Sequence, residues 1–422
     1  MSNNLTSNIS THVIPKFMES FNANRVICKT VDRQTFDGKF TPDVGSTVYV
    51  KRPHDYRVSS TSDGDLTSET TSKIVSGKAS ATVQNFKTVF VDWTILEQAT
   101  QLDQLEEILK PMATRLVTDL ETDFADFMLK RSGLVYGTPG TAIDAWTDVA
   151  GAGALMKSIG VPTDEQWNYV VNPAVGATLA SLQAGLSPGS GSKVDTAWEN
   201  AMVSKNVGGF RVLQSNALAS RTNTTAADLV GALSGAPTLT YVGAKDTMTQ
   251  VWAVTGFTAS ATVKAGSVIE VTGKYYCSQS TRQPIVDATG AGIKFRAVVT
   301  EDVTLGSSGE GNLTMSAPAI YEANGQYNTT TAALSTDVIT ILGTSGVIYQ
   351  PALFYHPKAF SLATVKLPKL SATESYTAAS DGISLRFTKW SDATKNQNKL
   401  RVDLLPAYGV LNPFFAGQGY GV

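Results

Sequence analysis

Side chains that could perform chemistry are sparse in this sequence, and they do not form a catalytic pattern. The three histidines, His12, His54 and His356, fall in a predicted helix, a polar segment and a strand end. None is accompanied by a patterned serine or cysteine nucleophile, which nucleophilic catalysis would require. Cys28 and Cys277 lie far apart in the chain and form neither a disulfide framework nor a metal cluster. We therefore expect two buried thiols in a reducing compartment.

Glycine-rich and acidic segments also fail as reactive sites. Gly185–Lys193 (GLSPGSGSK) lacks the Gly-Lys-Ser/Thr ending of a phosphate-binding loop, and Gly306–Gly311 (GSSGEG) is predicted to be a turn between strands. The acid pairs Glu106–Glu107 and Glu301–Asp302 are sequence neighbours, whose side chains do not converge on a helix or a strand. No zinc-binding or EF-hand spacing occurs. The sequence therefore predicts no enzymatic activity, no cofactor and no metal.

Composition excludes further functional classes. The chain has 422 residues, which favours two or three domains. Its net charge of −2 gives no electrostatic basis for gripping nucleic acid or an anionic membrane. Charged residues make up 17% of the chain, below the roughly 25% of typical soluble domains. We find no secretory signal at the N-terminus and no apolar run long enough for a membrane span.

The elements that could position functional groups are organised around a long helix at Asp103–Arg131. Its apolar residues recur every three or four positions, which places them on one helical face: Met112, Leu116, Leu120, Phe124, Phe127 and Met128. Asp103 and Glu106 have the form of a capping box. Pro111 predicts a kink or a short helix that feeds a longer one. The opposite face carries Asp119, Glu121, Asp123 and Asp126, and we interpret it as solvated or as a surface for a basic partner.

Before this spine helix, the chain alternates between short predicted elements and one long polar segment. The spacing from Leu5 to Phe21 predicts an amphipathic helix, and Val26–Val31 reads as a strand. Thr35–Phe40 and Ser46–Lys51 are predicted to form a hairpin around Pro42–Gly45. Residues 52–80 are polar and rich in turn residues, so they cannot bury themselves. We interpret them as an extended arm, with a disordered loop as the alternative, followed by a strand at 81–93.

After the spine helix, the patterns predict an α/β stretch and then an all-β region. The expected helices are Ala145–Ile159, Ala174–Leu182 and Val194–Met202, and the expected strands are Tyr169–Val171 and Phe210–Leu213. From about Arg221 to Gly346 only strands are expected, as in an antiparallel barrel or sandwich inserted into a host domain. The expected strands of this region are Thr238–Val242, Thr249–Thr255, Val268–Val271, Ile293–Val299, Asn312–Met315 and Asp337–Ile341.

The returning chain is predicted to add two strands, Ile383–Lys389 and Lys399–Leu404. They are joined by a long loop at Trp390–Asn398. Leu405–Pro413 is expected to end the ordered core. The elements thus suggest an α+β protein whose β-rich parts are built around one helix.

The order of these elements, together with nine short segments, resembles the major capsid protein of tailed bacteriophages. The similarity is greatest to coat proteins of short-tailed phages that carry a telokin-like β-barrel insertion. The segments are Thr30–Gln34 (TVDRQ), Lys51–His54 (KRPH), Leu102–Leu109 with Pro111, Val117–Glu121 (VTDLE), Thr196–Asn200 (TAWEN), Ala217–Arg221 (ALASR), Leu353–Tyr355, Leu367–Leu370 (LPKL) and Asp403–Tyr408 (DLLPAY). They run through nearly the whole host fold, whereas the insertion matches in position and β character.

This resemblance implies an α+β protein of the Hong Kong-type capsid fold with an inserted antiparallel β-barrel. Residues 1–30 would form an N-terminal arm, and 31–144 a peripheral domain with the extended loop 52–80 and the spine helix 103–131. Residues 145–221 would begin the axial domain, 222–346 would be the inserted barrel, and 347–422 would return to the axial domain and the peripheral β elements.

The implied function is structural. Copies would assemble as pentamers and hexamers into an icosahedral shell that encloses double-stranded DNA without binding it specifically. The resemblance further implies a precursor shell, expansion, a scaffolding protein and a portal, with assembly in the host cytoplasm and residence in the virion. No membrane partner is expected. The alternative is a secreted or fibre-associated β-rich binding module, such as a lectin or adhesin, for which the missing signal and the spine helix are unfavourable.

Three charged segments are candidates for contacts between subunits. In the inserted region, Gly243–Thr249 is either a contact loop or a plain surface hairpin. The loop at Trp390–Asn398 carries both charge signs and is either a contact around a threefold axis or a solvated tip. The candidate residues in the arm, the insertion and this loop are Arg52, Arg57, Asp63, Asp65, Lys73, Lys245, Asp246, Asp392, Lys395 and Lys399.

Overall fold

The computed structural model describes residues 14–36, 47–51, 58, 60–69, 78–94, 105–184, 206–238, 248–321, 327–333, 335–371 and 374–422. The chain divides into two compact units, which are described separately. Unit 1 comprises Met1–Val48, Ser80–Ala125 and Phe360–Gly409. Unit 2 comprises Tyr49–Ala79, Asp126–Ala359 and Val410–Val422. Each unit therefore combines segments that are far apart in the sequence.

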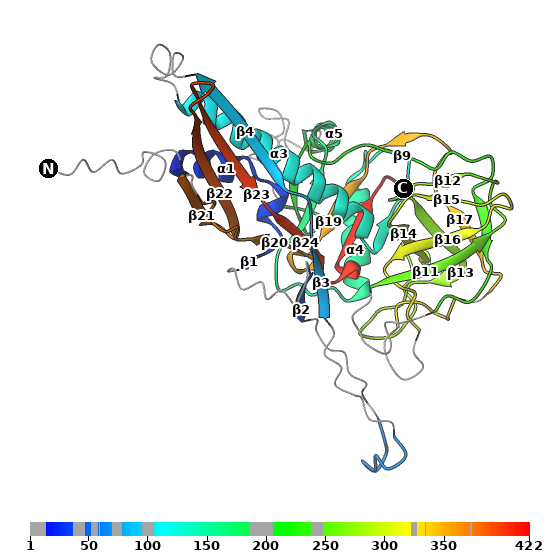
Figure 1. Cartoon of the computed structure of the whole chain (residues 1–422). Coiled ribbons are helices and arrows are strands. Elements are labelled where there is room, and N and C mark those ends of the chain that lie inside the picture. Colours follow the sequence, from blue (N-terminus) through cyan, green and yellow to red (C-terminus); the bar gives the residue numbers. More distant parts are fainter. Residues whose placement is uncertain are drawn as a thin grey trace. The chain divides into compact units, whose positions relative to one another are not determined.

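The predicted spine is confirmed as helix α3, Leu105–Arg131, which runs unbroken through Pro111 (Figure 1). A single helix thus replaces the alternative of two successive helices. Its predicted apolar face is buried except at Phe127, which is half-buried beside Arg131; the buried members are Met112, Leu116, Leu120, Phe124 and Met128. Asp103 of the predicted capping box lies outside the described residues.

The acidic face of α3 is the solvated surface that the sequence suggested only in part, because Asp119 is exposed whereas Glu121 is buried. Glu121 is 3% exposed, and its carboxylate accepts hydrogen bonds from the backbone N–H groups of Val26 (2.6 Å) and Cys28 (3.1 Å). Asp119 and Asp123 pair with Lys87, at 2.8 and 3.2 Å. These acids satisfy donors of their own chain, because the tertiary fold brings a helix N-terminus and a lysine to this face.

Unit 1 contains two sheets and a short N-terminal helix. Helix α1 (Ile14–Asn24) buries Phe17 against Phe387, with the ring centroids 5.3 Å apart. The five-stranded sheet has the order β1 (Asp32–Phe36), β20 (Phe360–Val365), β24 (Pro406–Val410), β3 (Lys78–Val83) and β2 (Thr47–Lys51). The four-stranded sheet has the order β21 (Glu374–Ser380), β22 (Ile383–Asp392), β23 (Gln397–Leu404) and β4 (Lys87–Thr94) (Figure 1).

Several local predictions in unit 1 are wrong because long-range pairing prevails over local pattern. The predicted strand Val26–Val31 contains the 3₁₀ turn η2 (Ile27–Lys29), whose backbone donors the Glu121 carboxylate satisfies. Residues 37–46 of the predicted hairpin lie outside the described residues. Its described ends belong to β1 and β2, which lie at opposite edges of the sheet, and β1 pairs in parallel with β20. The single strand predicted at 81–93 is divided between β3 and β4, which belong to different sheets.

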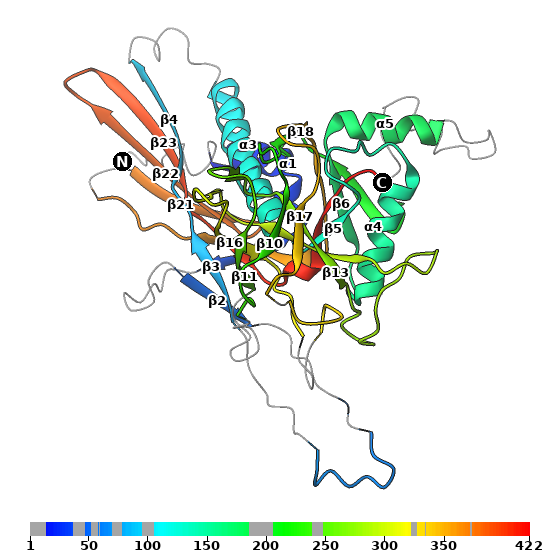
Figure 2. The same cartoon turned by 90° about the vertical axis from the view of Figure 1, so that its right-hand side faces the viewer.

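The host part of unit 2 is a six-stranded sheet flanked by two helices. Its order is β5 (Leu134–Tyr136), β25 (Ala416–Gly419), β19 (Ala352–Tyr355), β6 (Trp167–Val171), β8 (Phe210–Gln214) and β7 (Asn206–Val207). Helices α4 (Trp146–Ile159) and α5 (Pro173–Ala184) lie beside it (Figure 2) and confirm two predicted helices. The short turns η5 (Pro357–Ala359) and η6 (Pro413–Phe415) precede β20 and β25. The helix predicted at 194–202 and the glycine-rich segment 185–193 lie outside the described residues.

The last strand overturns the expectation that the ordered core ends at Leu405–Pro413. Strand β25 pairs in parallel with β5 and antiparallel with β19, so it occupies an interior position of the sheet. Its four residues are all buried. Three of them are small or glycine, a composition without the apolar periodicity by which strands are predicted.

The all-β region contains a closed barrel, which confirms an α+β protein with an inserted antiparallel barrel. The barrel order is β10 (Val230–Leu233), β11 (Thr249–Thr255), β16 (Gly311–Ser316), β14 (Lys294–Val299), β13 (Val268–Tyr275) and β17 (Val338–Ile341). Five of these strands match predicted ones, and Trp252, Phe295 and Leu313 fill the interior. A small ribbon, β12 (Thr262–Val263) with β15 (Val303–Thr304), accompanies it, and of the predicted strand 238–242 only Thr238 is described.

The two ends of the barrel region meet. Strand β9 (Arg221–Thr222) pairs antiparallel with β18 (Ile348–Tyr349), with Thr222 opposite Ile348 and Arg221 opposite Tyr349. The chain thus leaves the host sheet and returns to it at one place, which is the geometry that an insertion requires.

Candidate functional site: the junction of the inserted barrel

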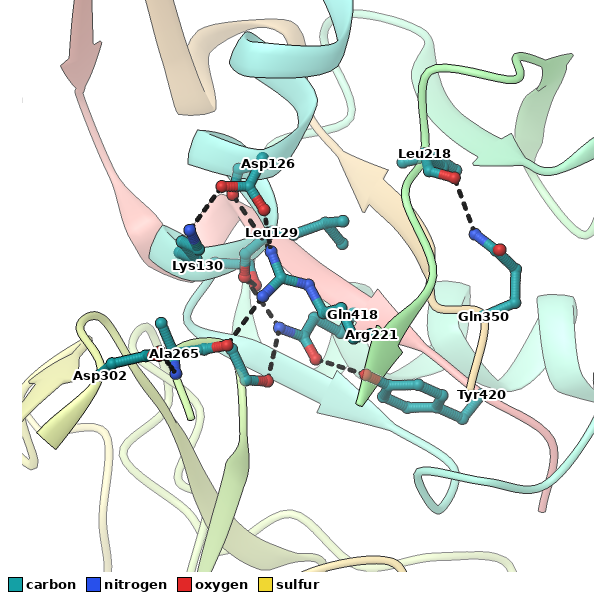
Figure 3. Close-up of polar contacts among 12 residues, drawn as sticks. Asp126, Leu129, Lys130, Leu218, Arg221, Ala265, Asp302, Gln350, Gln418 and Tyr420 are labelled. Carbon is teal, nitrogen blue, oxygen red and sulfur yellow. Dashed lines mark hydrogen bonds and ion pairs between the residues drawn. The ribbon is translucent and has the colours of Figure 1, made fainter. Parts of the chain in front are cut away.

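Arg221 connects the beginning of the barrel region to the end of α3 (Figure 3). Its side chain is 8% exposed. One terminal nitrogen, Nη2, donates to Asp126 Oδ1 at 2.6 Å, and the other, Nη1, donates to the carbonyl oxygen of Ala265 at 2.8 Å. Ala265 precedes β13 of the barrel. One side chain therefore holds the α3 terminus, the barrel and the entry strand β9 together through a planar fork of donors.

Local chemistry explains why these partners can approach so closely. Asp126 also pairs with Lys130 one turn later in α3, at 2.5 Å. Gly266 has a φ of +85°, and a Cβ at this position would lie 2.1 Å from Arg221 Nη1. Glycine is therefore required beside the guanidinium for both conformational and steric reasons.

Gln418 of β25 forms a second connection at the same place. Its side-chain Nε2 donates to the carbonyl oxygen of Leu129 at 2.8 Å and to that of Gly266 at 3.4 Å. The Tyr420 hydroxyl donates to Gln418 Oε1 at 2.6 Å, and burial raises the pKa of Tyr420 well above its ordinary value. Leu129 lies in the last turn of α3, where Gln418 satisfies a helix-end carbonyl (Figure 3).

The barrel is attached to the host at further points. Arg296 of β14 donates to the carbonyl oxygen of Gly137 at 2.7 Å and pairs with Glu270 at 3.0 Å. The Ser316 hydroxyl donates to the carbonyl oxygen of Ser132 at 2.9 Å. On the ribbon side, the Ala265 N–H donates to Asp302 at 2.7 Å and lowers the pKa of that carboxyl. The contacts to Gly137 and Ser132 fix the orientation of the barrel within unit 2.

The contacts at the junction are structural, since they attach the barrel to the host part of unit 2. Apart from the buried Arg221 Nε, which has no hydrogen-bond partner, the side chains described above are donors and acceptors that pair with one another, and no nucleophile among them faces a base. Within the described residues, no group of three or more His, Cys, Asp or Glu side chains is placed to hold a metal ion. None of the helices in the described part is both long and apolar enough to cross a membrane.

His356 also has a structural environment, at the end of β19 as predicted. Its side chain is fully buried, and its Nδ1 accepts a hydrogen bond from the backbone N–H of Lys358 at 3.1 Å. Nε2 lies 3.0 Å from Asp164 Oδ1, and this hydrogen bond lowers the pKa of Asp164 to about 2. Both ring nitrogens are therefore occupied by contacts that fix a loop. His12 and His54 lie outside the described residues.

The predicted contact residues of the arm and insertion are only partly visible. Arg52, Arg57, Lys73, Lys245 and Asp246 lie outside the described residues. Asp63 and Asp65 lie in an exposed turn of residues 60–69. Asp65 accepts hydrogen bonds from the Thr67 hydroxyl and N–H, which lower its pKa, while Asp63 accepts from the Asp65 N–H. The arm acids are thus engaged in local turns of their own.

Asp392, Lys395 and Lys399 occur together, but not in the long loop that the sequence predicted. Strand β22 ends at Asp392 and strand β23 begins at Gln397, so the turn comprises only residues 393–396. Asp392 accepts from the backbone N–H groups of Thr394 and Lys395 and pairs with Lys399 at 3.2 Å. The Lys399 contact lowers the pKa of Asp392. The strands extend because this carboxylate satisfies the turn.

Sequence reasoning did not identify the junction residues. Arg221 appeared as a boundary and as the end of the segment Ala217–Arg221, Asp126 as part of an acidic helix face, and Gln418 beyond the expected core. The position of Arg221, where the composition changes to that of an all-β region, could have indicated the junction, since an arginine buried there needs acidic and carbonyl partners. Nothing local pointed to Gln418, whose partners lie 289 and 152 residues away.

Comparison with known proteins identifies the chain. The family described as P22 coat protein, gene protein 5, matches residues 1–421. The major capsid protein of Acyrthosiphon pisum secondary endosymbiont phage 1 is 40% identical over 428 residues, covering 100% of both chains. Among solved structures, one from Mycobacterium phage Che8 has a TM-score of 0.45 at 12% identity, covering 93% of this chain and 90% of that chain.

The capsid structure of cyanophage P-SCSP1u has the same TM-score of 0.45 and 12% identity, covering 93% of this chain and 86% of that chain. These structural similarities accompany the sequence matches, which alone carry the assignment. Because both sequence matches extend from end to end, the chain belongs to the P22 coat protein family and is a structural subunit of a phage capsid.

Proposed function

We propose that this subunit assembles as pentamers and hexamers into an icosahedral precursor shell, which then expands around double-stranded DNA. A scaffolding protein and a portal are the proposed assembly partners, and the host cytoplasm is the proposed site of assembly. The observation that supports this most strongly is the 40% identity to a major capsid protein over the full length of both chains. The net charge of −2 is compatible with enclosing DNA without binding it specifically.

The proposal assigns no catalysis to the subunit. Its contribution is a set of weak contacts that symmetry repeats over the shell. The peripheral domain is proposed to correspond largely to unit 1, and the axial domain with its barrel to unit 2. The junction around Arg221 then has a clear task, which is to hold the barrel in one orientation so that every copy presents the same surface.

The arm is proposed to be ordered by a neighbouring subunit. Val58 is 89% exposed and Leu66 is 58% exposed, so two apolar side chains of the arm find no cover within their own chain. Arg52, Arg57 and Lys73 remain candidates for charged contacts there. Lys245 and Asp246 remain candidates in the insertion, with a plain surface hairpin as the alternative for that loop.

Electron microscopy of the purified protein tests the proposal. Expression with a scaffolding protein from a phage of the same family should give closed shells, and expression alone should give shells or polyheads. The alternative, a fibre-associated binding module, predicts soluble monomers or rods under both conditions. Monodisperse monomers at high concentration, with and without scaffold, would refute shell assembly.

A further inference from the structure

Two tyrosines of the inserted region form a stacked pair. The rings of Tyr321 and Tyr327 lie nearly parallel, with an interplanar angle of 10° and ring centroids 5.0 Å apart. Their backbones form an antiparallel bridge, so the two side chains project from opposite positions of paired segments. Residues 322–326 between them lie outside the described residues. The pair is therefore held together by backbone pairing as well as by ring contact.

The chain on both sides of this pair is fixed by buried hydrogen bonds. Asn328 is 2% exposed, and its side-chain amide donates to the carbonyl oxygen of Pro318 at 2.7 Å. Its side-chain oxygen accepts from the N–H of Ile320 at 2.6 Å, and its own N–H donates to the Ile320 carbonyl oxygen at 3.0 Å. The two tyrosines therefore meet in one defined arrangement, which removes most of the entropic cost of an encounter between free side chains.

Arg282 packs on the same pair. Its guanidinium carbon lies 5.4 Å from the centroid of the Tyr327 ring. Arg282 has a φ of +60°, which is uncommon for a residue with a side chain, and its N–H donates to the carbonyl oxygen of Ser278 at 2.8 Å. The attraction between the cation and the ring restrains Tyr327 from turning away from Tyr321.

Exposure distinguishes this pair from a second tyrosine pair of the protein. Tyr321 is 40% exposed and Tyr327 is half-buried, so a reagent in solution reaches the stack. Tyr349 and Tyr420 have ring centroids 5.5 Å apart, but their interplanar angle is 72° and they are only 7% and 0% exposed. The stacked pair thus combines proximity with access, whereas the second pair is shielded.

Two phenol rings in this arrangement can be joined by oxidation. Each tyrosine gives up one electron and its phenolic proton and becomes a phenoxyl radical, whose unpaired electron lies partly on the ring carbons beside the hydroxyl, Cε1 and Cε2. A bond forms between one such carbon of each ring, and the two ring hydrogens then move to the phenolic oxygens, which gives dityrosine. The pair loses two hydrogen atoms in total, and one molecule of hydrogen peroxide takes them up to become two molecules of water.

We propose that Tyr321 and Tyr327 are a site of oxidative cross-linking, at which hydrogen peroxide acting through a haem peroxidase joins the two rings as dityrosine. The bond closes residues 321–327 into a covalent loop and stabilises the inserted region by restricting its unfolded state. Cysteines do not serve this purpose here, since Cys28 and Cys277 are both buried free thiols. The inference goes beyond the proposed function and does not depend on shell assembly.

Limited oxidation of the full-length protein tests the proposal. The dilute purified subunit is treated with hydrogen peroxide and a haem peroxidase, then unfolded and digested with a protease that cleaves after glutamate. Glu322 separates the two tyrosines in the sequence, so cleavage after it yields two peptides that stay connected only through dityrosine. Mass spectrometry should find these two peptides linked with the loss of two hydrogen atoms, and the protein should gain dityrosine fluorescence.

Three variants locate the bond. Tyr321→Phe and Tyr327→Phe should each abolish the linked peptides, because phenylalanine has no phenolic hydrogen to give up. The matched control is Tyr376→Phe, which changes a half-buried tyrosine of unit 1 and should leave the yield of linked peptides unchanged. Thermal unfolding checks that all three variants remain folded.

Absence of the linked peptides from the unaltered protein, under conditions in which the same reagents couple N-acetyltyrosine, would overturn the proposal. Dityrosine formed mainly between subunits, or through tyrosines other than these two, would also overturn it. The same conclusion would follow if either phenylalanine variant at position 321 or 327 gave as much dityrosine as the unaltered protein.

Discussion

Replacing Arg221 should destabilise unit 2 more than replacing an exposed charged residue of comparable size. We consider Arg221→Met, which keeps most of the aliphatic volume and removes both donors. The charge-assisted bond to Asp126 contributes about 1.5–3 kcal/mol, and leaving the Ala265 carbonyl without its donor costs about 1–3 kcal/mol. Asp126 is 37% exposed, so water and Lys130 replace part of the lost interaction. The expected loss is therefore about 2–4 kcal/mol in the free energy of unfolding.

Lys130→Met provides the matched control. It removes the other cation from the same carboxylate, but both of these side chains are about a third exposed. Its expected cost is about 0–1 kcal/mol. Urea unfolding of the purified subunit, followed by tryptophan fluorescence, to which buried Trp252 contributes, and by circular dichroism, measures both variants. Equal losses from the two substitutions, or a loss from Arg221→Met below about 0.5 kcal/mol, would refute the reasoning that burial makes this junction strong.

Three further predictions concern the rest of the chain. Burial raises the pKa of Glu121 above its ordinary value of 4.5, so its ionisation costs the folded state stability as pH rises through the folded pKa. Glu121→Gln retains an acceptor for the N–H groups of Val26 and Cys28 but cannot ionise. The stability of this variant relative to the unaltered protein should therefore increase as the pH rises above 4.5 through the folded pKa of Glu121. A constant difference between the urea unfolding midpoints of the two proteins over these pH values would contradict this. Deletion of Ser59–Thr71 should leave a folded subunit, by circular dichroism, that does not close shells, and normal shells would contradict ordering of the arm by a neighbour. Asp392→Lys should impair shell closure without unfolding the subunit. Adding Lys395→Asp to this variant should partly restore closure at low salt. If neither these charge changes nor salt affect assembly, the hairpin turn is a solvated tip and not a contact between subunits.

Local periodicity predicted the elements whose partners lie nearby or whose apolar pattern is long. The face of α3 was readable because Met112, Leu116, Leu120 and Phe124 recur at helical spacing, and most of them are fully buried. Strand β11 was predicted at its observed bounds, since Trp252 and Val254 alternate with outward residues. The barrel as an inserted antiparallel region followed from a long series of strands without helices.

Elements that depend on pairing with distant segments could not be predicted from local sequence patterns. Strand β1 pairs with β20 more than 300 residues later, and its short sequence DRQTF gives no sign of a parallel partner. The hairpin at Trp390–Asn398 was assigned a long loop because its residues are polar, although the Asp392 carboxylate allows the strands to continue. Polar sequence indicated exposure correctly but did not indicate its backbone conformation.

The sequence by itself determined the class of the molecule, the spine helix, the inserted barrel and the capsid family, because these depend on periodicity and on segments spread along the whole chain. Tertiary structure alone decided which polar groups pair with distant donors of the same chain. Glu121 and Asp126 share one acidic helix with solvent-facing residues, yet one satisfies the donors of η2 and the other holds Arg221. A carboxylate is retained in such a place only when the fold brings donors to it, and those donors come from residues about 95 positions away.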